Sequence, residues 1–369
     1  MPVFGKATQP IGLDIGSEVI RVAQIKQASD LLLSKHGELR THGSLTDGET
    51  TDVDALASAI SDLWKKANIT ERKVILGISN QKVIVRLLTM PYMEKDDLKS
   101  AVEFQAQDNI PIPVDEAILD YQVINDFKNK DNERTMQIVL VAAQKEMIQS
   151  HITALEKARL KPYVVDVSSF ALSRSLLGNE SVVPDNKEIE KNESPIGILD
   201  IGESVTNISI VVKRTPLFSR VITMGDNMFL KAIADSLAVQ PEEAKKIKEE
   251  IGFPKQGDEL TEGLSAKQLE KGEKVRRVLS DEAIKFVDEV KRSFDYGLTE
   301  TAGDEELSEL IVSGSGASNK NLLTYLETAY KKVSIGDALS RVNVPAGQSL
   351  DDQTGYAIAI GLALRGIDE

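Results

Sequence analysis

The strongest pattern of apolar and polar positions along the chain occurs twice. Residues 11–25 form an apolar run that ends in Asp14-Ile-Gly16, a tight turn, and a second run of alternating apolar and polar positions. Residues 196–210 repeat this order around Asp200-Ile-Gly202. The apolar runs predict buried strands, and the alternation predicts strands with one buried face. The spacing is far too long for a solenoid repeat, so the sequence predicts two copies of one α/β domain.

The residues between the two copies predict a mixture of helices and strands. Apolar residues recur at helical spacing over 53–68, with Asp52 or Asp54 near the start as the N-cap. Strand-like runs follow, and the second of these, together with the five elements expected beyond Pro91, gives the order βαββαβ, which predicts a split βαβ unit inserted into the first domain. The expected elements are strands over 73–78 and 82–88, a helix over 95–108, strands over 117–125 and 135–142, a helix over 145–158, a strand over 163–167, a strand–turn–helix over 310–317, and a helix with a face of small residues over 355–364.

Composition and charge exclude several classes of function. The chain of 369 residues has no cysteine, which excludes cysteine-ligated metal centres, thiol catalysis and a disulfide-stabilised fold. Its three histidines are not at metal-ligand spacing. With 58 acidic against 44 basic side chains the net charge is -14, which argues against a nucleic-acid binder or a polybasic membrane binder. No signal peptide or membrane-spanning stretch is predicted, so the protein is expected to stay where it is made.

The two Asp-Ile-Gly turns are candidates for phosphate binding. A glycine directly after a strand lets backbone N–H groups approach a phosphate, and an aspartate at the strand end can hold Mg²⁺ through water. One such turn alone would more often open an ordinary hairpin, but two copies in matched contexts favour a site that grips a triphosphate from both sides. The turn at Gly314 and Gly316 has the same character and suits a nucleoside, or it is a structural turn.

These motifs carry a resemblance to a known family. Together with the stretches 89–93, 101–106, 109–113, 120–123 and 165–174, the turns make nearly the whole chain similar to the PilM family, the actin-like cytoplasmic proteins of type IV pilus assembly. The resemblance implies an α/β fold with duplicated actin-like ATPase (ribonuclease H-like) domains. It implies a first domain of residues 1–88, 165–194 and 350–369, an inserted subdomain of residues 89–164, and a second domain of residues 195–349.

The resemblance also implies a site for ATP and Mg²⁺. Three departures stand out: Glu18 and Glu203 place negative charge in the phosphate turns, and Lys245 stands where a ribose-binding glutamate is usual. Since hydrolysis needs an ordered water and stabilised negative charge, at most slow ATPase activity is expected. The implied nucleotide-binding residues are Asp14, Gly16, Ser17, Arg21, Asp200, Gly202, Thr206, Lys248, Gly314 and Gly316, with Asp14 and Asp200 at the metal.

The implied partner is a PilN-like membrane-anchored pilus protein. Its N-terminal cytoplasmic segment is expected in a groove near residues 87–93 and the inserted subdomain, where Leu87, Leu88, Met90, Tyr92 and Met93 supply apolar surface or pack the insertion onto its host domain. The protein would then be cytoplasmic and recruited to the inner face of the membrane, with homo-oligomers also conceivable. The alternatives are an FtsA-like filament or scaffold protein, a nucleotide-free scaffold, and a phosphotransfer enzyme of the same fold, for which no motif is found.

Overall fold

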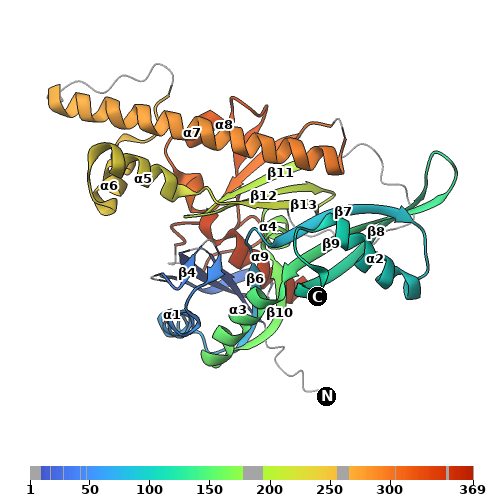
Figure 1. Cartoon of the computed structure of the whole chain (residues 1–369). Helices are drawn as coiled ribbons and strands as arrows, with labels where there is room; N and C mark the ends of the chain where they lie inside the picture. Colours follow the sequence, from blue (N-terminus) through green and yellow to red (C-terminus); the bar gives the residue numbers. More distant parts are fainter. Residues whose placement is uncertain are drawn as a thin grey trace.

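The computed structural model describes residues 10–16, 18–27, 29–41, 43–46, 48–177, 194–255, 266–303, 305–345 and 349–368. Two sheets dominate this part of the chain (Figure 1). The first contains β1 (Ile11–Ile15), β2 (Val19–Gln27), β3 (Leu31–Arg40), β6 (Lys73–Ile78) and β10 (Lys161–Val167). The second contains β11 (Ile196–Ile201), β12 (Thr206–Val212), β13 (Thr215–Ile222), β14 (Glu309–Ser313) and β15 (Val333–Ile335), and is extended by β7 (Val83–Pro91), β9 (Arg134–Gln144) and β8 (Ala117–Lys128).

The two sheets share one topology, which confirms the duplication predicted from the sequence. The strand order is β10-β6-β1-β2-β3 in the first and β15-β14-β11-β12-β13 in the second. In both, the first three strands of the copy are antiparallel neighbours and the last two run parallel to the first strand. Asp14 pairs with Arg21 and Asp200 with Asn207 at equivalent registers. The two Asp-Ile-Gly turns therefore leave equivalent ends of equivalent strands.

Helices complete the layers on both sides of each sheet. The helices, including the one-turn 3-10 segments η1–η3, are α1 (Val53–Lys66), α2 (Lys95–Asn109), η1 (Val114–Glu116), α3 (Lys145–Lys157), α4 (Ser168–Leu177), α5 (Asp226–Leu237), α6 (Pro241–Ile251), α7 (Ala266–Thr301), η2 (Ser315–Ser318), α8 (Leu322–Leu326), η3 (Thr354–Tyr356) and α9 (Ala357–Asp368). A short hairpin joins β4 (Leu45–Thr46) to β5 (Glu49–Thr50). Asp52 is the N-cap of α1, because its Oδ1 accepts the N–H groups of Asp54 (3.0 Å) and Ala55 (2.9 Å).

The hydrophobic core consists of separate clusters, each formed where helices pack their apolar faces on a sheet. Helices α1 and α3 pack on one face of the first sheet, and α5, α6 and α7 pack with one face of the second. Helices α4 and α9 lie between the sheets, where their apolar residues join Ile75 of β6 and Ile198 of β11 in one cluster. We call the elements around the first sheet the first lobe and those around the second sheet the second lobe.

Small residues allow α9 to sit deep in this central layer. A Cβ on Gly361 would lie 1.9 Å from the carbonyl oxygen of Ala171 on α4, and a Cβ on Gly12 of β1 would lie 2.2 Å from that of Ala359. The face of small residues predicted over 355–364 is therefore a packing surface. It fixes the strand that carries Asp14 against the helix that both lobes share.

The six elements expected in the insertion all form, but they are divided between the two sheets. Strands β7, β9 and β8 extend the second sheet, with α2 packed over them. By contrast, β10 pairs in parallel with β6, and α3 packs beside α1 in the core of the first lobe. The inserted module thus comprises β7, α2, η1, β8 and β9. Strand β7 continues past the predicted end at residue 88 to Pro91, which pairs with Thr135.

None of the helices in the described ranges is both long enough and apolar enough to cross a membrane.

Candidate functional site

The two Asp-Ile-Gly turns form the walls of a cleft between the lobes. In each, the glycine N–H donates to a carbonyl three residues on: Gly16 to Val19 at 3.1 Å and Gly202 to Val205 at 2.9 Å. A Cβ would lie 2.8 Å from that carbonyl oxygen at Gly16 and 2.9 Å at Gly202. Any larger residue would force the turn open, which explains why glycine follows the strand in both copies.

Asp14 and Asp200 are buried at the ends of β1 and β11. Each residue is only 6% exposed. Burial raises the pKa of Asp14 to about 7, although Arg21 opposes the shift, and nearby Asp200 adds to it. Burial likewise raises the pKa of Asp200 to about 6, against the hydrogen bond from Asn207. Both carboxyl groups resist ionisation because they are buried near each other. A cation bound between them would favour their ionised forms and would itself be strongly stabilised.

Asn207 and Ser79 position Asp200, and the sequence analysis missed both. The Asn207 side-chain Nδ2 donates to Asp200 Oδ2 at 3.0 Å, and the Ser79 hydroxyl donates to the side-chain Oδ1 of Asn207. Asn207 belongs to β12, whereas Ser79 follows β6 in the first lobe. The only sequence signal was that Asn207 stands at the position equivalent to Arg21 in the other copy.

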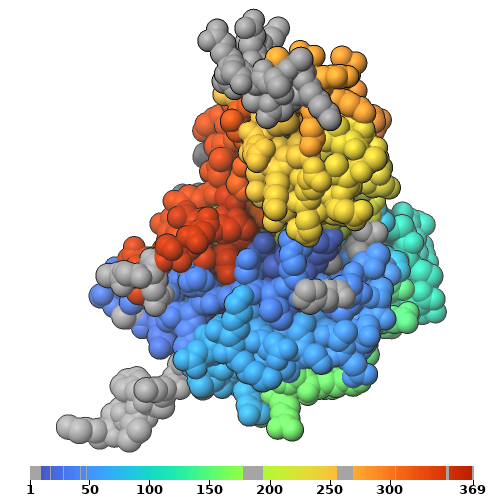
Figure 2. All heavy atoms as spheres, turned by 90° about the vertical axis from the view of Figure 1, so that its left-hand side faces the viewer, coloured from blue at the N-terminus to red at the C-terminus, as the bar shows by residue number. Residues whose placement is uncertain are grey.

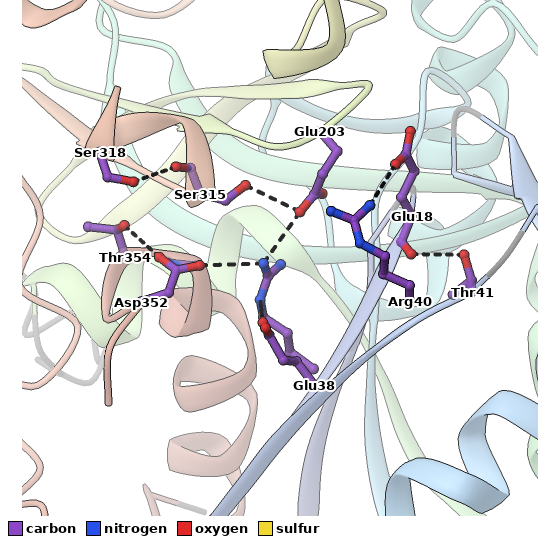
Figure 3. A network of polar contacts seen from close by, with 11 residues as sticks. Glu18, Glu38, Arg40, Thr41, Glu203, Ser315, Ser318, Asp352 and Thr354 are labelled. Carbon is purple, nitrogen blue, oxygen red and sulfur yellow. Dashed lines mark hydrogen bonds and ion pairs between the residues drawn. The ribbon is translucent and has the colours of Figure 1, made fainter. Parts of the chain in front are cut away.

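Arg21 is the basic residue at the centre of the cleft. Its Nε lies 3.2 Å from Glu38, and its Nη2 lies 3.4 Å from both Glu203 and Asp352 (Figure 3). Burial alone would lower the pKa of Arg21, but the surrounding carboxylates, led by Glu203 and Asp14, raise it. The Arg21 side chain is only 8% exposed, so its guanidinium is held as a fixed positive charge between the lobes.

Glu18 links the same two lobes from the other side. Its carboxylate accepts hydrogen bonds from Ser204 Oγ at 3.2 Å and from the Asn227 side-chain amide, and it lies 3.4 Å from Arg40. Ser204 and Asn227 belong to the second lobe. Figure 2 shows the two lobes in contact on this side of the molecule, with the yellow surface of residues 226–251 directly against the blue surface of the first lobe.

The cavity enclosed by these contacts has a volume of about 40 Å³. A few water molecules fit into this space, but a nucleoside triphosphate does not. It is lined by Asp14, Ile15, Gly16, Arg21, Ser79, Asp200, Gly202, Glu203, Val205, Asn207, Gly314, Ser315, Gly355 and Ile358. Six of the ten residues expected at the site therefore come together here: Asp14, Gly16, Arg21, Asp200, Gly202 and Gly314.

Three of the other expected residues lie away from the cavity lining, and Ser17 lies outside the described residues. Thr206 is fully buried and its hydroxyl donates to the Met224 carbonyl at 2.6 Å. Gly316 packs on Ile201, whose Cγ2 would be 2.4 Å from an added Cβ. Lys248 is 7% exposed and forms an ion pair with Asp226 at the start of α5. In this conformation Lys248 fixes α6 to α5.

The residues of the cleft fit a magnesium ion. Mg²⁺ takes one or two carboxylates and keeps several waters, and Asp14 and Asp200 supply two carboxylates beside the water-sized space. A cluster of three or more His, Cys, Asp or Glu side chains able to hold a metal does not occur in the described part of the chain. An ion held mainly through water agrees with that donor set.

A second, larger cavity of about 620 Å³ lies where the inserted module meets the second lobe. Strands β7 and β13 pair at a single position, Val85 with Ser219. The consecutive residues 219–224 form one wall, and the wall from the inserted module includes Arg86. The Arg86 guanidinium lies over the rings of Phe218 (4.8 Å) and Tyr296 (5.6 Å), and burial lowers its pKa.

The side chains expected to line a partner groove over 87–93 divide between two surfaces. Leu88 and Met90 are buried beneath α2, so they pack the inserted module. Leu87 points to the opposite face and packs against the core of the first lobe. Tyr92 and Met93 are partly buried at the edge of the α2 cluster.

Comparisons with known proteins agree with this architecture. A family model described as type IV pilus assembly protein PilM matches residues 12–367. A chain of a PilM–PilN type IV pilus biogenesis complex has a TM-score of 0.78 at 24% identity, covering 98% of this chain and 100% of that chain. The ethanolamine utilization protein EutJ from Carboxydothermus hydrogenoformans has a TM-score of 0.54 at 13% identity, over 96% of this chain and 89% of that one. MreB5 of Spiroplasma citri bound to ADP has a TM-score of 0.53 at 13% identity, over 96% and 94%. These likenesses confirm the actin-like fold predicted from the sequence.

Proposed function

The chain belongs to the PilM family of type IV pilus assembly proteins, and from this premise we propose that it is an adaptor that binds ATP with Mg²⁺ and the N-terminal segment of a PilN-like membrane protein. The observation that carries the nucleotide part is the pair of equivalent turns that face each other across one cleft. The partner part is supported by the similar solved chain, which is that of a PilM–PilN complex. Such an adaptor would work in the cytoplasm, at the inner face of the membrane.

Nucleotide binding requires the lobes to separate first. In the open cleft, the backbone N–H groups beside Gly16 and Gly202 would approach the phosphates, and Arg21 would offset their charge. Asp14 and Asp200 would hold Mg²⁺ through water, and the bare turn at Gly314 would border the nucleoside. The ADP bound to MreB5 shows that a relative with this fold takes a nucleotide, which supports the proposal.

Binding is a better description of the proposed activity than catalysis. A hydrolase needs a group that orients the attacking water and stabilises developing negative charge. Ser168, at the start of α4, carries no carboxylate that could orient a water molecule, and its hydroxyl donates to the Ile78 carbonyl at 3.2 Å. Glu203 lines the cleft and adds negative charge near the phosphates. We therefore expect hydrolysis to be slow at most.

For the partner we propose the 620 Å³ cavity at the start of β7, directly before residues 87–93. Because β7 and β13 share only the Val85–Ser219 pair, their facing edges offer backbone groups to an extended peptide. The cavity also shares residue Ser219 with a small serine-lined cavity that in turn shares Ser79 and Asn207 with the cleft. A movement of Asp200 on metal binding would therefore reach the peptide site through Asn207, Ser79 and Ser219.

Two measurements test the two parts separately. Thermal unfolding with Mg²⁺ and ATP, against ATP alone, should show a metal-dependent rise in melting temperature, since a ligand of the native state stabilises it. Little phosphate should be released. The absence of any rise would refute nucleotide binding and favour a nucleotide-free scaffold.

The partner test uses a labelled peptide with the N-terminal sequence of a PilN-like protein. Thr223→Trp would fill the cavity from an exposed lining position, and Thr70→Trp is the matched control in an exposed segment of the first lobe. We expect at least about tenfold weaker binding for Thr223→Trp only. Equal binding by both variants would place the peptide elsewhere. Point variants are preferable to deletion of residues 91–164, which would remove α3 and most of β10 from the first lobe.

A further inference from the structure

The carboxylate of Glu203 occupies the position in the cleft where an anionic ligand is expected. Glu203 follows Gly202 directly, in the second turn, and its side chain is 13% exposed. Its Oε1 accepts a hydrogen bond from Ser315 Oγ at 3.2 Å and lies 3.4 Å from Arg21 Nη2. Arg21 and Ser315 are donors suited to a phosphate oxygen, and both line the cleft. In the free protein, Arg21 and Ser315 contact the Glu203 carboxylate instead of a phosphate.

The first turn makes the reciprocal contact. Glu18 reaches from the first lobe to Ser204 and Asn227 in the second lobe, as described above. Each turn therefore carries a glutamate that bonds the opposite lobe. Asn227 is itself tied to the second turn, because its N–H donates to the Glu203 carbonyl at 2.8 Å. The two glutamates thus act on one connected set of groups.

We propose that Glu203 and Glu18 form a latch that holds the cleft closed, in which the Glu203 carboxylate stands in for a phosphate group of the ligand. Separation of the lobes withdraws Arg21 from Glu203, and a nucleotide that binds the open cleft then engages Arg21 and Ser315 with its phosphate, so that the latch cannot form again. This inference rests on the proposed function for the identity of the ligand, but the latch itself is a property of the free protein. Its consequence is that affinity for nucleotide is reduced by the fraction of molecules held closed.

The deciding variant is Glu203→Gln, and Glu38→Gln is its control. Both substitutions remove one negative charge from the surroundings of Arg21, and Glu38 lies closer to the guanidinium, at 3.2 Å. Glu38, however, stands on β3 in the same lobe as Arg21, so it does not bridge the lobes. An effect of charge alone would appear in both variants. An effect of the latch would appear in Glu203→Gln only.

Two readouts distinguish failure of the latch from failure of the proposed function. The first is the affinity for Mg²⁺ and ATP by calorimetry, expected to rise at least about tenfold in Glu203→Gln. The second needs no nucleotide. Because the chain has no cysteine, Lys65→Cys on α1 and Lys285→Cys on α7 can carry spin labels whose separation reports the distance between lobes.

We expect Glu203→Gln to broaden and lengthen this distance distribution in the free protein, and Glu38→Gln to leave it unchanged. A longer distance with no ATP binding in any variant would support the latch and refute the nucleotide proposal. An unchanged distance, or equal gains in affinity for both variants, would overturn the latch.

Discussion

Replacing Asp14 by asparagine tests whether burial of a charged carboxylate in the cleft lowers the free energy of unfolding. The raised pKa means that ionisation of Asp14 opposes folding, and that this cost grows as the pH rises from near 4 towards 7. The rise from the ordinary value of 3.8 to about 7 corresponds to about 4 kcal/mol above pH 7, at about 1.4 kcal/mol for each pK unit. At pH 5 the corresponding cost is only about 1.5 kcal/mol. Asparagine has nearly the same shape and cannot ionise.

We therefore expect Asp14→Asn to be more stable than the parent protein without ligand, and more so at pH 8 than at pH 5. Water entering the cleft reduces the full figure, so about 1–2 kcal/mol at pH 8 is a realistic gain. The same variant should lose the stabilisation by Mg²⁺ and ATP, because the metal would lose one of two carboxylates.

The assay is urea unfolding of the free protein at pH 5 and pH 8, followed by thermal unfolding with Mg²⁺ and ATP. Asp131→Asn, at an exposed loop position, is the control for removing one negative charge. A variant that is less stable than the parent at pH 8, or equally stabilised at both pH values, would refute the reasoning about burial. Retained magnesium-dependent binding would refute the role of Asp14 at the metal.

Two further predictions concern the framework of the first lobe. His151 on α3 is 3% exposed, its Nε2 has no hydrogen-bond partner among the residues that the structure describes, and burial lowers its pKa. Stability should therefore fall as the pH drops below about 6.5. His151→Leu should lessen that fall in urea midpoints measured at pH 5 and 7.5. Gly361→Ala should destabilise by at least about 1–3 kcal/mol because its Cβ would meet the Ala171 carbonyl at 1.9 Å; a higher melting temperature, which helix propensity alone would give, would contradict the packing argument.

The sequence predicted most helices and strands correctly, because each of them depends on the local spacing of apolar residues. The repeated Asp-Ile-Gly strands, the helix over 53–68 and the strand over 73–78 all form where apolar spacing predicts them. What the spacing could not say is which strand pairs with which. Residues 163–167 are predicted as the last strand of the insertion, yet β10 buries Val167 in the first lobe and pairs with β6. Which sheet a strand joins depends on contacts between segments that are distant in the sequence, so the local pattern of apolar residues does not determine it.

The site shows the same limit at the level of single residues. Asp14, Gly16, Asp200 and Gly202 are constrained by their own turns, so their positions follow from the motif. Asn207 could not be assigned a role, because what it does depends on Ser79 from the other lobe.

Charge near the cleft shows why composition alone misleads about these turns. Two glutamates beside phosphate-binding turns suggest repulsion, and the sequence therefore predicts a nucleotide site with slow hydrolysis at most. In the folded protein, Glu203 faces Arg21 and Glu18 faces Ser204 and Asn227, so each glutamate has donors in the opposite lobe. The repulsion becomes important only when a phosphate enters the cleft and competes with the glutamates for the same hydrogen-bond donors. The same acidic residues that weaken binding are therefore suited to hold the free protein closed, and the balance between the two effects sets how strongly nucleotide controls the distance between lobes.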